Sequence, residues 1–344
     1  MPNMKQKKEI RMEDIAKELN ISIVSVSNAL RNKKGVSTEL RQRVKEMADA
    51  LGYQIPRALE EEEERICCIG IMIAKRYIEE HSSFYMNIYK HIARLISEKN
   101  GLTFLAVISE DEEVGETKRS YYKDAAVDGI IFIGRMSTDF IRGVVGELEV
   151  PSVGIDFYDL DVQIDYIIPD HFRGTQHITQ QLIDAGHRDI AFLGDPYSGE
   201  SQMDQYMGYC KALWLNGLRE YKGWTIPSKG ETGSEVVLPQ SGKLPTAIII
   251  SDESYTGSLL KALGNKGLKV PEDVSLAGAG CFCPVLSEGL VLTGYQKDEA
   301  VLAHGGVDIL KERLEGRTGR GVIHTKECCH AEGNTVKSPL NPAL

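Results

Sequence analysis

A pair of short helices joined by a tight turn is predicted between Asp14 and Asn32, where the chain reads DIAKELNISIVSVSNALRN. Apolar residues recur at helical spacing on one face of the first helix, and these are Ile15, Ala16 and Leu19. Asn20 should end this helix, because asparagine is one of the few residues other than glycine that tolerate a left-handed backbone. The segment therefore predicts a small helical unit, and these three apolar residues form the inner face of its first helix.

The outer face of the second helix carries short, uncharged side chains. Ser22 is expected to cap this helix, and its inward positions at helical spacing are Val26, Ala29 and Leu30. The side chains left for the outer face are Ile23, Val24, Ser25, Ser27, Asn28 and Asn32. Most solvated helices carry Glu and Lys instead, so we predict a face that enters a DNA groove. A helical hairpin used for dimerisation is the alternative.

A third helix completes the unit and is followed by an acidic segment. Ser37 is its expected cap, its apolar stripe is Leu40, Val44, Met47 and Leu51, and Gly52 ends it. The predicted helical head spans residues 9–57. Residues 58–65 form a predicted linker that contains five consecutive glutamates, Glu60 to Glu64.

The charge of the chain is divided between its parts. The total is −10, but residues 1–57 hold 12 Lys and Arg against 7 Asp and Glu, a net of +5. The remaining residues hold 28 against 43, a net of −15. A basic head on an acidic body concentrates the attraction for phosphates at the predicted helices and keeps the body away from a duplex.

From Ile66 onward, short apolar runs alternate with helical patterns, which predicts parallel sheets in an α/β body. Predicted strands are Ile66–Ile73, Thr103–Ile108, Gly129–Ile133, Ser152–Ile155, Asp189–Leu193, Ala247–Ile250 and Val274–Ala277. The amphipathic segments between them include Tyr85–Lys99, Phe172–Ala185, Met203–Leu215 and Tyr255–Lys266. No Gly-rich phosphate loop follows any strand, so no nucleotide cofactor is expected. No set of nucleophile, base and orienting group stands out, so no catalytic residue is assigned.

The compartment follows from what the sequence lacks. No charged-then-apolar leader is present, and the longest uncharged apolar run, Ile66 to Ala74, is too short to span a bilayer. The seven cysteines form no spaced disulfide framework, and no zinc-ligand spacing involves them. We therefore expect a cytoplasmic protein without a metal site. His81, His171, His187 and His304 are interpreted as structural or solvated.

The order of four motifs in the head, DIAKELNIS, SVSNAL, GVS and RQRVKEMADALGY, resembles the headpiece of the lactose-repressor (LacI) family of bacterial transcription regulators. The resemblance implies a helix-turn-helix whose second helix enters the major groove of double-stranded operator DNA. Position by position, it implies base contacts from Ile23, Val24 and Asn28. It also places Ser22, Ser25, Ser27 and Ser37 near phosphates.

The body resembles the ligand-binding body of the same family through VDGIIFIG, LIDAGHRDIAFLG, PTAIIISDE and GLKVPEDVSLAG. This implies an effector-binding and dimerisation domain over residues 66–337, similar to periplasmic sugar-binding proteins, with two α/β lobes joined by three crossings. The crossings are expected near Asp165, Thr293 and Gly321. Lobe 1 would then be about 66–165 and 293–320, and lobe 2 about 166–292 and 321–337.

A pocket is expected at the carboxyl ends of the strands, where open α/β sheets bind ligands. The candidate effector-binding residues are Arg76, Phe84, Tyr85, Arg135, Asp156, Asp170, Gln205, Trp224, Asp252, Cys281 and Gln296. Family members that bind sugars or purines commonly have an arginine at the position of Gln205 and an aspartate at that of Cys281. The loss of an arginine fork removes a bidentate grip on a hydroxyl pair or a carboxylate.

The resemblance implies a function with three partners: operator DNA, a sugar-like effector and a second copy of the chain. The function expected is that of a transcriptional repressor which a small molecule controls. At two positions that contact DNA in the family, this sequence departs from the family's pattern. The family most often has arginine at Asn28, and asparagine suits adenine instead. The family's minor-groove leucine would fall at Glu62, inside the glutamate run, with Leu59 the nearest substitute. The rival interpretation is a solute-binding sensor or an α/β enzyme with a helical head that does not bind DNA.

Overall fold

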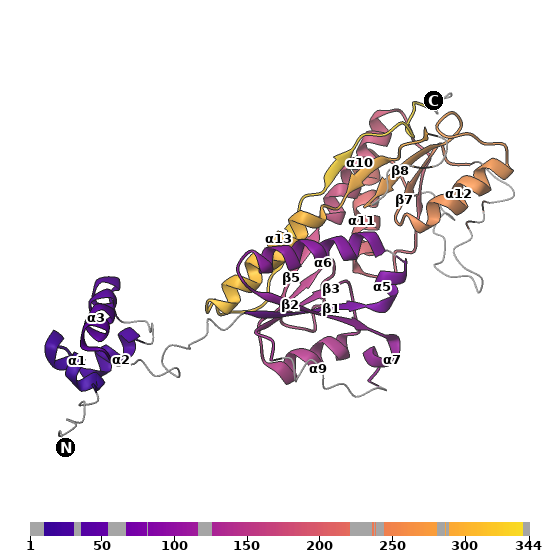
Figure 1. Cartoon of the computed structure of the whole chain (residues 1–344). Helices are drawn as coiled ribbons and strands as arrows, with labels where there is room; N and C mark the ends of the chain where they lie inside the picture. The colour runs from indigo at the N-terminus through magenta and orange to yellow at the C-terminus, as the bar shows by residue number, and fades with distance from the viewer. Residues whose placement is uncertain are drawn as a thin grey trace, which may run out of the picture. The chain divides into compact units, whose positions relative to one another are not determined.

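A computed structural model describes residues 10–30, 36–53, 67–80, 82–115, 126–220, 236, 238, 244–280, 286 and 289–339 (Figure 1). The chain divides into two compact units, Met1–Ile66 and Cys67–Leu344, and each is treated by itself. The predicted class, an all-α helix-turn-helix head followed by a two-lobed α/β body with parallel sheets, is confirmed. The acidic linker predicted over residues 58–65 lies outside the described residues.

Unit 1 is a three-helix head, with α1 (Met12–Leu19), α2 (Ile23–Leu30) and α3 (Thr38–Leu51) packed on one another. Its buried core consists of Ile15, Ala16, Val26, Ala29, Leu30, Val44 and Ala48. The inward positions predicted for the first two helices are confirmed, with Leu19 only partly buried. Asn20 ends α1 with a left-handed backbone, φ 52°, and Gly52 ends α3 in the same conformation, φ 73°.

Sheet A of unit 2 has the strand order β10-β5-β4-β3-β1-β2, and all of its paired strands are parallel. The strands are β1 (Cys68–Ala74), β2 (Leu102–Ile108), β3 (Gly129–Ile133), β4 (Ser152–Ile155), β5 (Asp165–Pro169) and β10 (Ile323–Lys326). One face packs on α6 (Ser82–Ser97) and α13 (Glu299–Leu314), which contact each other. The other face packs on α9 (Thr138–Leu148). The short helices α5 (Lys75–Glu80) and α7 (Glu110–Glu113) follow β1 and β2.

Sheet B has the order β11-β9-β8-β7-β6, in which β11 (Cys329–Ala331) is antiparallel to β9 (Thr293–Gln296) and the other pairs are parallel. The remaining strands are β6 (Ile190–Leu193), β7 (Ala247–Ile250) and β8 (Ser275–Ala279). One face packs on α10 (His171–Asp184) and α11 (Glu200–Leu215). The opposite face packs on α12 (Ser254–Asn265). Because both faces of each sheet are covered, inner strands such as β3 and β7 read as continuous apolar runs.

The three crossings between the sheets fall one strand later than predicted. The expected positions, Asp165, Thr293 and Gly321, lie at or just before the amino ends of β5, β9 and β10. Each of these strands completes the sheet that the chain is about to leave: β5 and β10 pair in sheet A, and β9 pairs in sheet B. The lobe boundaries predicted near these positions are therefore wrong by one strand, because the chain crosses only at strand carboxyl ends.

A buried ion pair fixes one end of α13 to sheet A. Arg313 Nε donates to Asp165 Oδ2 at 2.6 Å, and the Val322 amide donates to Asp165 Oδ1 at 2.9 Å. Burial by itself would raise the pKa of Asp165, but the hydrogen bonds from Arg313 and Val322 outweigh it and hold the pKa below its usual value. The carboxylate thus joins β5, α13 and the start of β10.

We predict that Asp165→Asn lowers the free energy of unfolding of unit 2 by about 3 kcal/mol, because it leaves Arg313 without its anion. Since the folded-state pKa is lowered, this stability is present above the usual carboxyl pKa and is lost as the pH falls through the lowered value. The difference between wild type and variant should therefore shrink in acid. Urea unfolding followed by tryptophan fluorescence measures it, since both tryptophans belong to unit 2.

Asp139→Asn is the matched control, because Asp139 pairs with Arg142 at 2.8 Å on the surface. An exposed pair of this kind contributes about 1 kcal/mol or less. Equal losses in the two variants would contradict the account.

Candidate functional site

The outer face of α2 presents exposed apolar side chains at its first turn. Ser22 Oγ accepts a hydrogen bond from the Ser25 amide at 3.0 Å and lies 2.8 Å from Ser25 Oγ, so the cap is formed. The next two side chains are open to solvent, Ile23 at 46% and Val24 at 66% exposure. No acidic or basic residue lies in the first or last turn of α2. The helix start is therefore an uncharged surface of apolar groups and hydroxyls.

The other predicted DNA contacts are distributed around this turn. Ser27 and Asn28 are half-buried along α2. Ser37 is exposed and caps α3, its Oγ accepting from the Leu40 amide at 3.2 Å. Asn32 lies outside the described residues.

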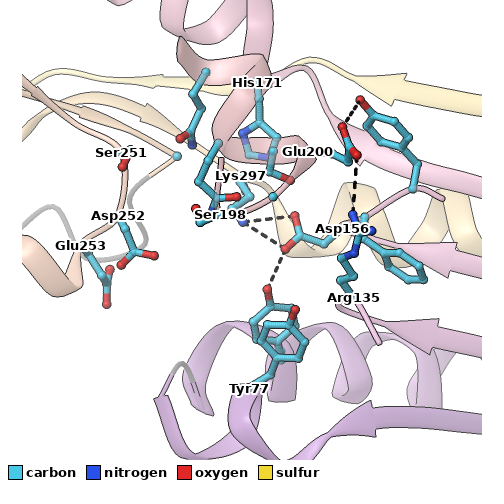
Figure 2. Close-up of a pocket in the computed structure, with 18 residues that line it drawn as sticks. Tyr77, Arg135, Asp156, His171, Ser198, Glu200, Ser251, Asp252, Glu253 and Lys297 are labelled. Carbon is cyan, nitrogen blue, oxygen red and sulfur yellow. Dashed lines mark hydrogen bonds and ion pairs between the residues drawn. The ribbon is translucent and has the colours of Figure 1, made fainter. Parts of the chain in front are cut away.

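Unit 2 contains a cavity of about 170 Å³ at the carboxyl ends of the strands of both sheets (Figure 2). The size suits one small ring rather than a drug-sized ligand, whose pockets are usually roughly 300–1,000 Å³. Five of the predicted effector-binding residues line the cavity: Tyr85, Arg135, Asp156, Gln205 and Asp252. They come from α6, the segments after β3, β4 and β7, and α11. Strand ends that are far apart in the sequence thus meet at one site.

A buried ion pair forms one wall of the cavity. Lys297 Nζ lies 3.1 Å from both carboxylate oxygens of Asp156, and the Tyr85 hydroxyl donates to Asp156 Oδ2 at 2.9 Å (Figure 2). Burial, and after it the Asp156 charge, raise the pKa of Tyr85 well above its ordinary value, so the phenol stays protonated and donates. The Lys297 ammonium also lies 4.6 Å from the centre of the Phe84 ring.

Three buried polar atoms in the cavity lining make no hydrogen bond within the described part of the chain. They are His171 Nε2, Gln205 Oε1 and Ser251 Oγ. Their residues are 2%, 4% and 6% exposed. Burial, and after it the Lys297 charge, hold the pKa of His171 well below its ordinary value, so the imidazole is neutral. Buried polar groups are nearly always paired, so these three atoms can pair with a ligand or with water in the cavity.

A polar bridge spans the opening between the two lobes. Glu200, in the first turn of α11, has Oε1 at 3.8 Å from Arg135 Nη1, and Oε2 accepts from the Tyr158 hydroxyl at 3.5 Å (Figure 2). Behind them, burial and the charges of Glu200 and Asp170 raise the pKa of Asp204 to about 6. These long contacts between partly exposed groups are weak, so the bridge can open.

Four predicted effector residues do not line the cavity. Arg76 pairs with Glu113 and donates to the Arg135 carbonyl at 2.5 Å, and Phe84 is fully buried in the core. Asp170 caps α10, its Oδ1 accepting from the Arg173 amide at 3.0 Å, and Gln296 lies in β9 opposite Cys329. For these four, the predicted place in the pocket is wrong. Trp224 and Cys281 lie outside the described residues.

Three lining residues that the sequence reasoning missed stand next to a residue that it chose. Tyr77, His171 and Lys297 line the cavity, and they follow Arg76, Asp170 and Gln296. Of these three, Lys297 directly follows a strand end, where a shift of one residue turns the side chain to the other face. His171, interpreted from the sequence as structural or solvated, is buried and lies at hydrogen-bond distance from Tyr295, and its ring also lines the cavity.

The described residues include neither a membrane-spanning helix nor a cluster of metal-ligating side chains. No helix among them has the length and apolar content needed to cross a membrane. No three His, Cys, Asp or Glu side chains among them are grouped as metal ligands would be.

The chain matches two known sequence families. Residues 11–55 match the bacterial regulatory proteins of the lacI family, and residues 179–328 match a periplasmic binding protein-like domain. Catabolite control protein A of Staphylococcus aureus is 26% identical over 279 residues, which cover 78% of this chain and 81% of that protein. The HTH-type transcriptional repressor PurR of Glaesserella parasuis serovar 5 is 25% identical over 312 residues, covering 88% and 90%.

Solved structures show the same fold. A complex of the transcriptional regulator CelR with cellobiose has a TM-score of 0.63 at 21% identity, covering 95% of this chain and 99% of that one. A Lac repressor dimer bound to operator and the anti-inducer ONPF has a TM-score of 0.61 at 19% identity, covering 96% and 100%. A regulator from Enterococcus faecium with bound ribose has a TM-score of 0.62 at 17% identity, covering 79% and 99%.

We predict that Lys297→Met destabilises unit 2 by about 3–5 kcal/mol, because it leaves the Asp156 carboxylate buried without its cation. Asp156→Asn combined with Lys297→Met should cost clearly less than the sum of the two single changes. Urea unfolding of the four proteins measures this coupling. Strictly additive losses would show that the pair does not act as a unit.

Proposed function

We propose that this chain, which belongs to the lacI family of bacterial regulatory proteins, reads its operator through the outer face of α2 and responds to a small molecule in the cavity of unit 2. The family consists of transcriptional regulators rather than enzymes, so the enzyme interpretation of the body is wrong.

The exposure of Val24 carries the DNA-reading proposal. A valine that is 66% exposed at the start of a capped helix, beside Ile23 and two serine hydroxyls, has no partner in the core of the head. Methyl groups of this kind fit against thymine methyls in the major groove, while hydroxyls near the helix start suit phosphates. The head carries a net charge of +5, which would attract the duplex without base selectivity.

Two copies of the chain would bind one operator. The Lac repressor of similar fold is a dimer on its operator, and two helix-turn-helix heads address two half-sites about one helical turn apart or a multiple of it. We therefore propose a homodimer, joined through unit 2, that acts as a repressor in the cytoplasm, where the chromosome is.

The cavity of unit 2 is proposed as the effector site, with a sugar-like molecule as its occupant. Regulators of similar fold hold cellobiose and ribose. In this chain, three buried polar atoms that find no hydrogen-bond partner among the described residues lie in the lining of a space of about 170 Å³. A ligand that binds one arrangement of the two lobes better than the other shifts DNA affinity by that difference.

We predict an A·T pair in the half-site at the Asn28 contact, because asparagine can bind adenine N6 and N7 with two hydrogen bonds. Selection of sites from random DNA with the full-length protein gives this base directly. Asn28→Ala should relax the preference at that one position. A strict preference for guanine at that position, unchanged by Asn28→Ala, would contradict the assignment.

We also predict that the operator is bent less than in relatives that insert a leucine into the minor groove, since Glu60–Glu64 would be repelled by both phosphate strands. Those residues and Leu59 lie outside the described part of the chain, so the prediction is drawn from the sequence. Circular-permutation gel shifts measure the bend. A bend as large as in those relatives, abolished by Leu59→Ala, would show that Leu59 has taken over as the wedge.

A further inference from the structure

We propose that the effector of this protein is a hydroxylated molecule that carries a protonated amine, as an amino sugar does, and that Asp252 receives the amine. The inference rests on the proposed role of the cavity as effector site. It goes beyond that role by naming the charge of the ligand and the residues that select it.

The charges of the lining favour a cation over an anion. Four carboxylates line the cavity, Asp156, Glu200, Asp252 and Glu253, against two basic side chains, Arg135 and Lys297. Each basic group already lies beside a carboxylate: Lys297 beside Asp156 at 3.1 Å, and Arg135 beside Glu200 at 3.8 Å. A phosphate or carboxylate ligand would therefore meet a net negative wall.

Asp252 is placed to receive an ammonium group. It directly follows β7 and Ser251, and its Oδ1 accepts from the Ser254 amide at 2.9 Å, which fixes the carboxylate on the cavity wall. The structure gives its Oδ2 no hydrogen-bond donor among the described residues. A charge-assisted hydrogen bond from an amine would use this oxygen. Figure 2 shows Asp252 and Glu253 on the same side of the pocket, below Ser251.

The three unpaired atoms define the hydroxyl half of the site. Gln205 Nε2 donates to the Ala279 carbonyl at 3.0 Å, which turns Oε1 into the cavity as an acceptor. The neutral His171 ring has Nδ1 at 3.2 Å from the Tyr295 hydroxyl. When Tyr295 donates to that nitrogen, Nε2 carries the hydrogen and donates into the cavity. Ser251 Oγ can do either.

An amide acceptor, an imidazole nitrogen that donates in one tautomer, and a hydroxyl together suit the alcohol groups of a sugar, since each alcohol both donates and accepts. An ionised phosphate or carboxylate only accepts, so it would leave Gln205 Oε1 buried without a donor. The hydroxyl half and the carboxylates of the site therefore each disfavour an anionic ligand, and they do so for independent reasons. The amine distinguishes the proposed ligand from a neutral sugar, which the hydroxyl half alone would accept.

Calorimetric titration of the full-length protein tests the proposal with three sets of probes of matched ring, each holding a hexose, its 2-amino-2-deoxy derivative and its 6-phosphate. The sets are those of glucose, galactose and mannose. In at least one set the amine should bind about tenfold more tightly than the neutral sugar, and no phosphate should bind. Asp252→Asn should remove the tenfold preference, so that the variant binds the amine and the neutral sugar of that set with equal affinity.

Glu149→Gln is the matched control, because Glu149 is an exposed carboxylate after α9, before the amino end of β4. It should leave all affinities unchanged. The proposal is overturned if a 6-phosphate binds best, if amine and neutral sugar bind alike, if Asp252→Asn leaves the preference intact, or if no probe binds. DNA binding by the same preparation is measured alongside, so a protein that binds DNA but no amine refutes this inference alone, whereas loss of DNA binding refutes the proposed function.

Discussion

The buried ion pair between Asp156 and Lys297 holds together the part of unit 2 where the chain passes between its two sheets. Asp156 follows the last residue of β4, and Lys297 follows the last residue of β9. The pair therefore fastens a crossing that leaves sheet B to the end of a strand in sheet A. Tyr85 on α6 donates to the same carboxylate at 2.9 Å, which adds the helix that covers the sheet. A ligand in the cavity would lie directly against this ion pair.

The constraint behind this arrangement is that parallel strands place their carboxyl ends at one edge. Every crossing in unit 2 leaves from such an end, after β5, β9 and β10. His171 and Lys297, just past the ends of β5 and β9, line the cavity. The contact from Glu200 to Arg135 joins partly exposed side chains, whereas the pair of Lys297 with Asp156 is buried. A ligand in the cavity would therefore contact the segments that join the two lobes.

The buried strands could be predicted from the sequence, because a strand that is buried on both faces is a run of apolar residues. The strands Gly129–Ile133, Ser152–Ile155 and Ala247–Ile250 were predicted to the residue, since each is an apolar run between turns. The inner face of α2 followed from helical spacing. Strands β5, β9, β10 and β11 were missed, and β10 shows why: its side chains are partly exposed, so it carries no apolar run.

The site was harder to predict than the fold because one residue decides the direction of a side chain at a strand end. Gln296 was chosen, and Lys297 lines the cavity. Arg76 was predicted in the pocket because it follows the first strand, but Glu113 holds it in another network. No local pattern in the sequence reveals which charges pair with each other, since Asp156 and Lys297 are far apart along the chain.

The central claim is that the exposed face of α2 reads the operator, and Val24→Glu tests it most directly. The side chain is 66% exposed, so the head should still fold, while a carboxylate there would oppose the phosphates. Val114→Glu, at a valine 69% exposed in unit 2, is the matched control. Fluorescence anisotropy with the selected operator should show at least a roughly hundredfold loss of affinity for Val24→Glu, about 2.7 kcal/mol, and none for Val114→Glu. Equal affinity of wild type and Val24→Glu would contradict the account.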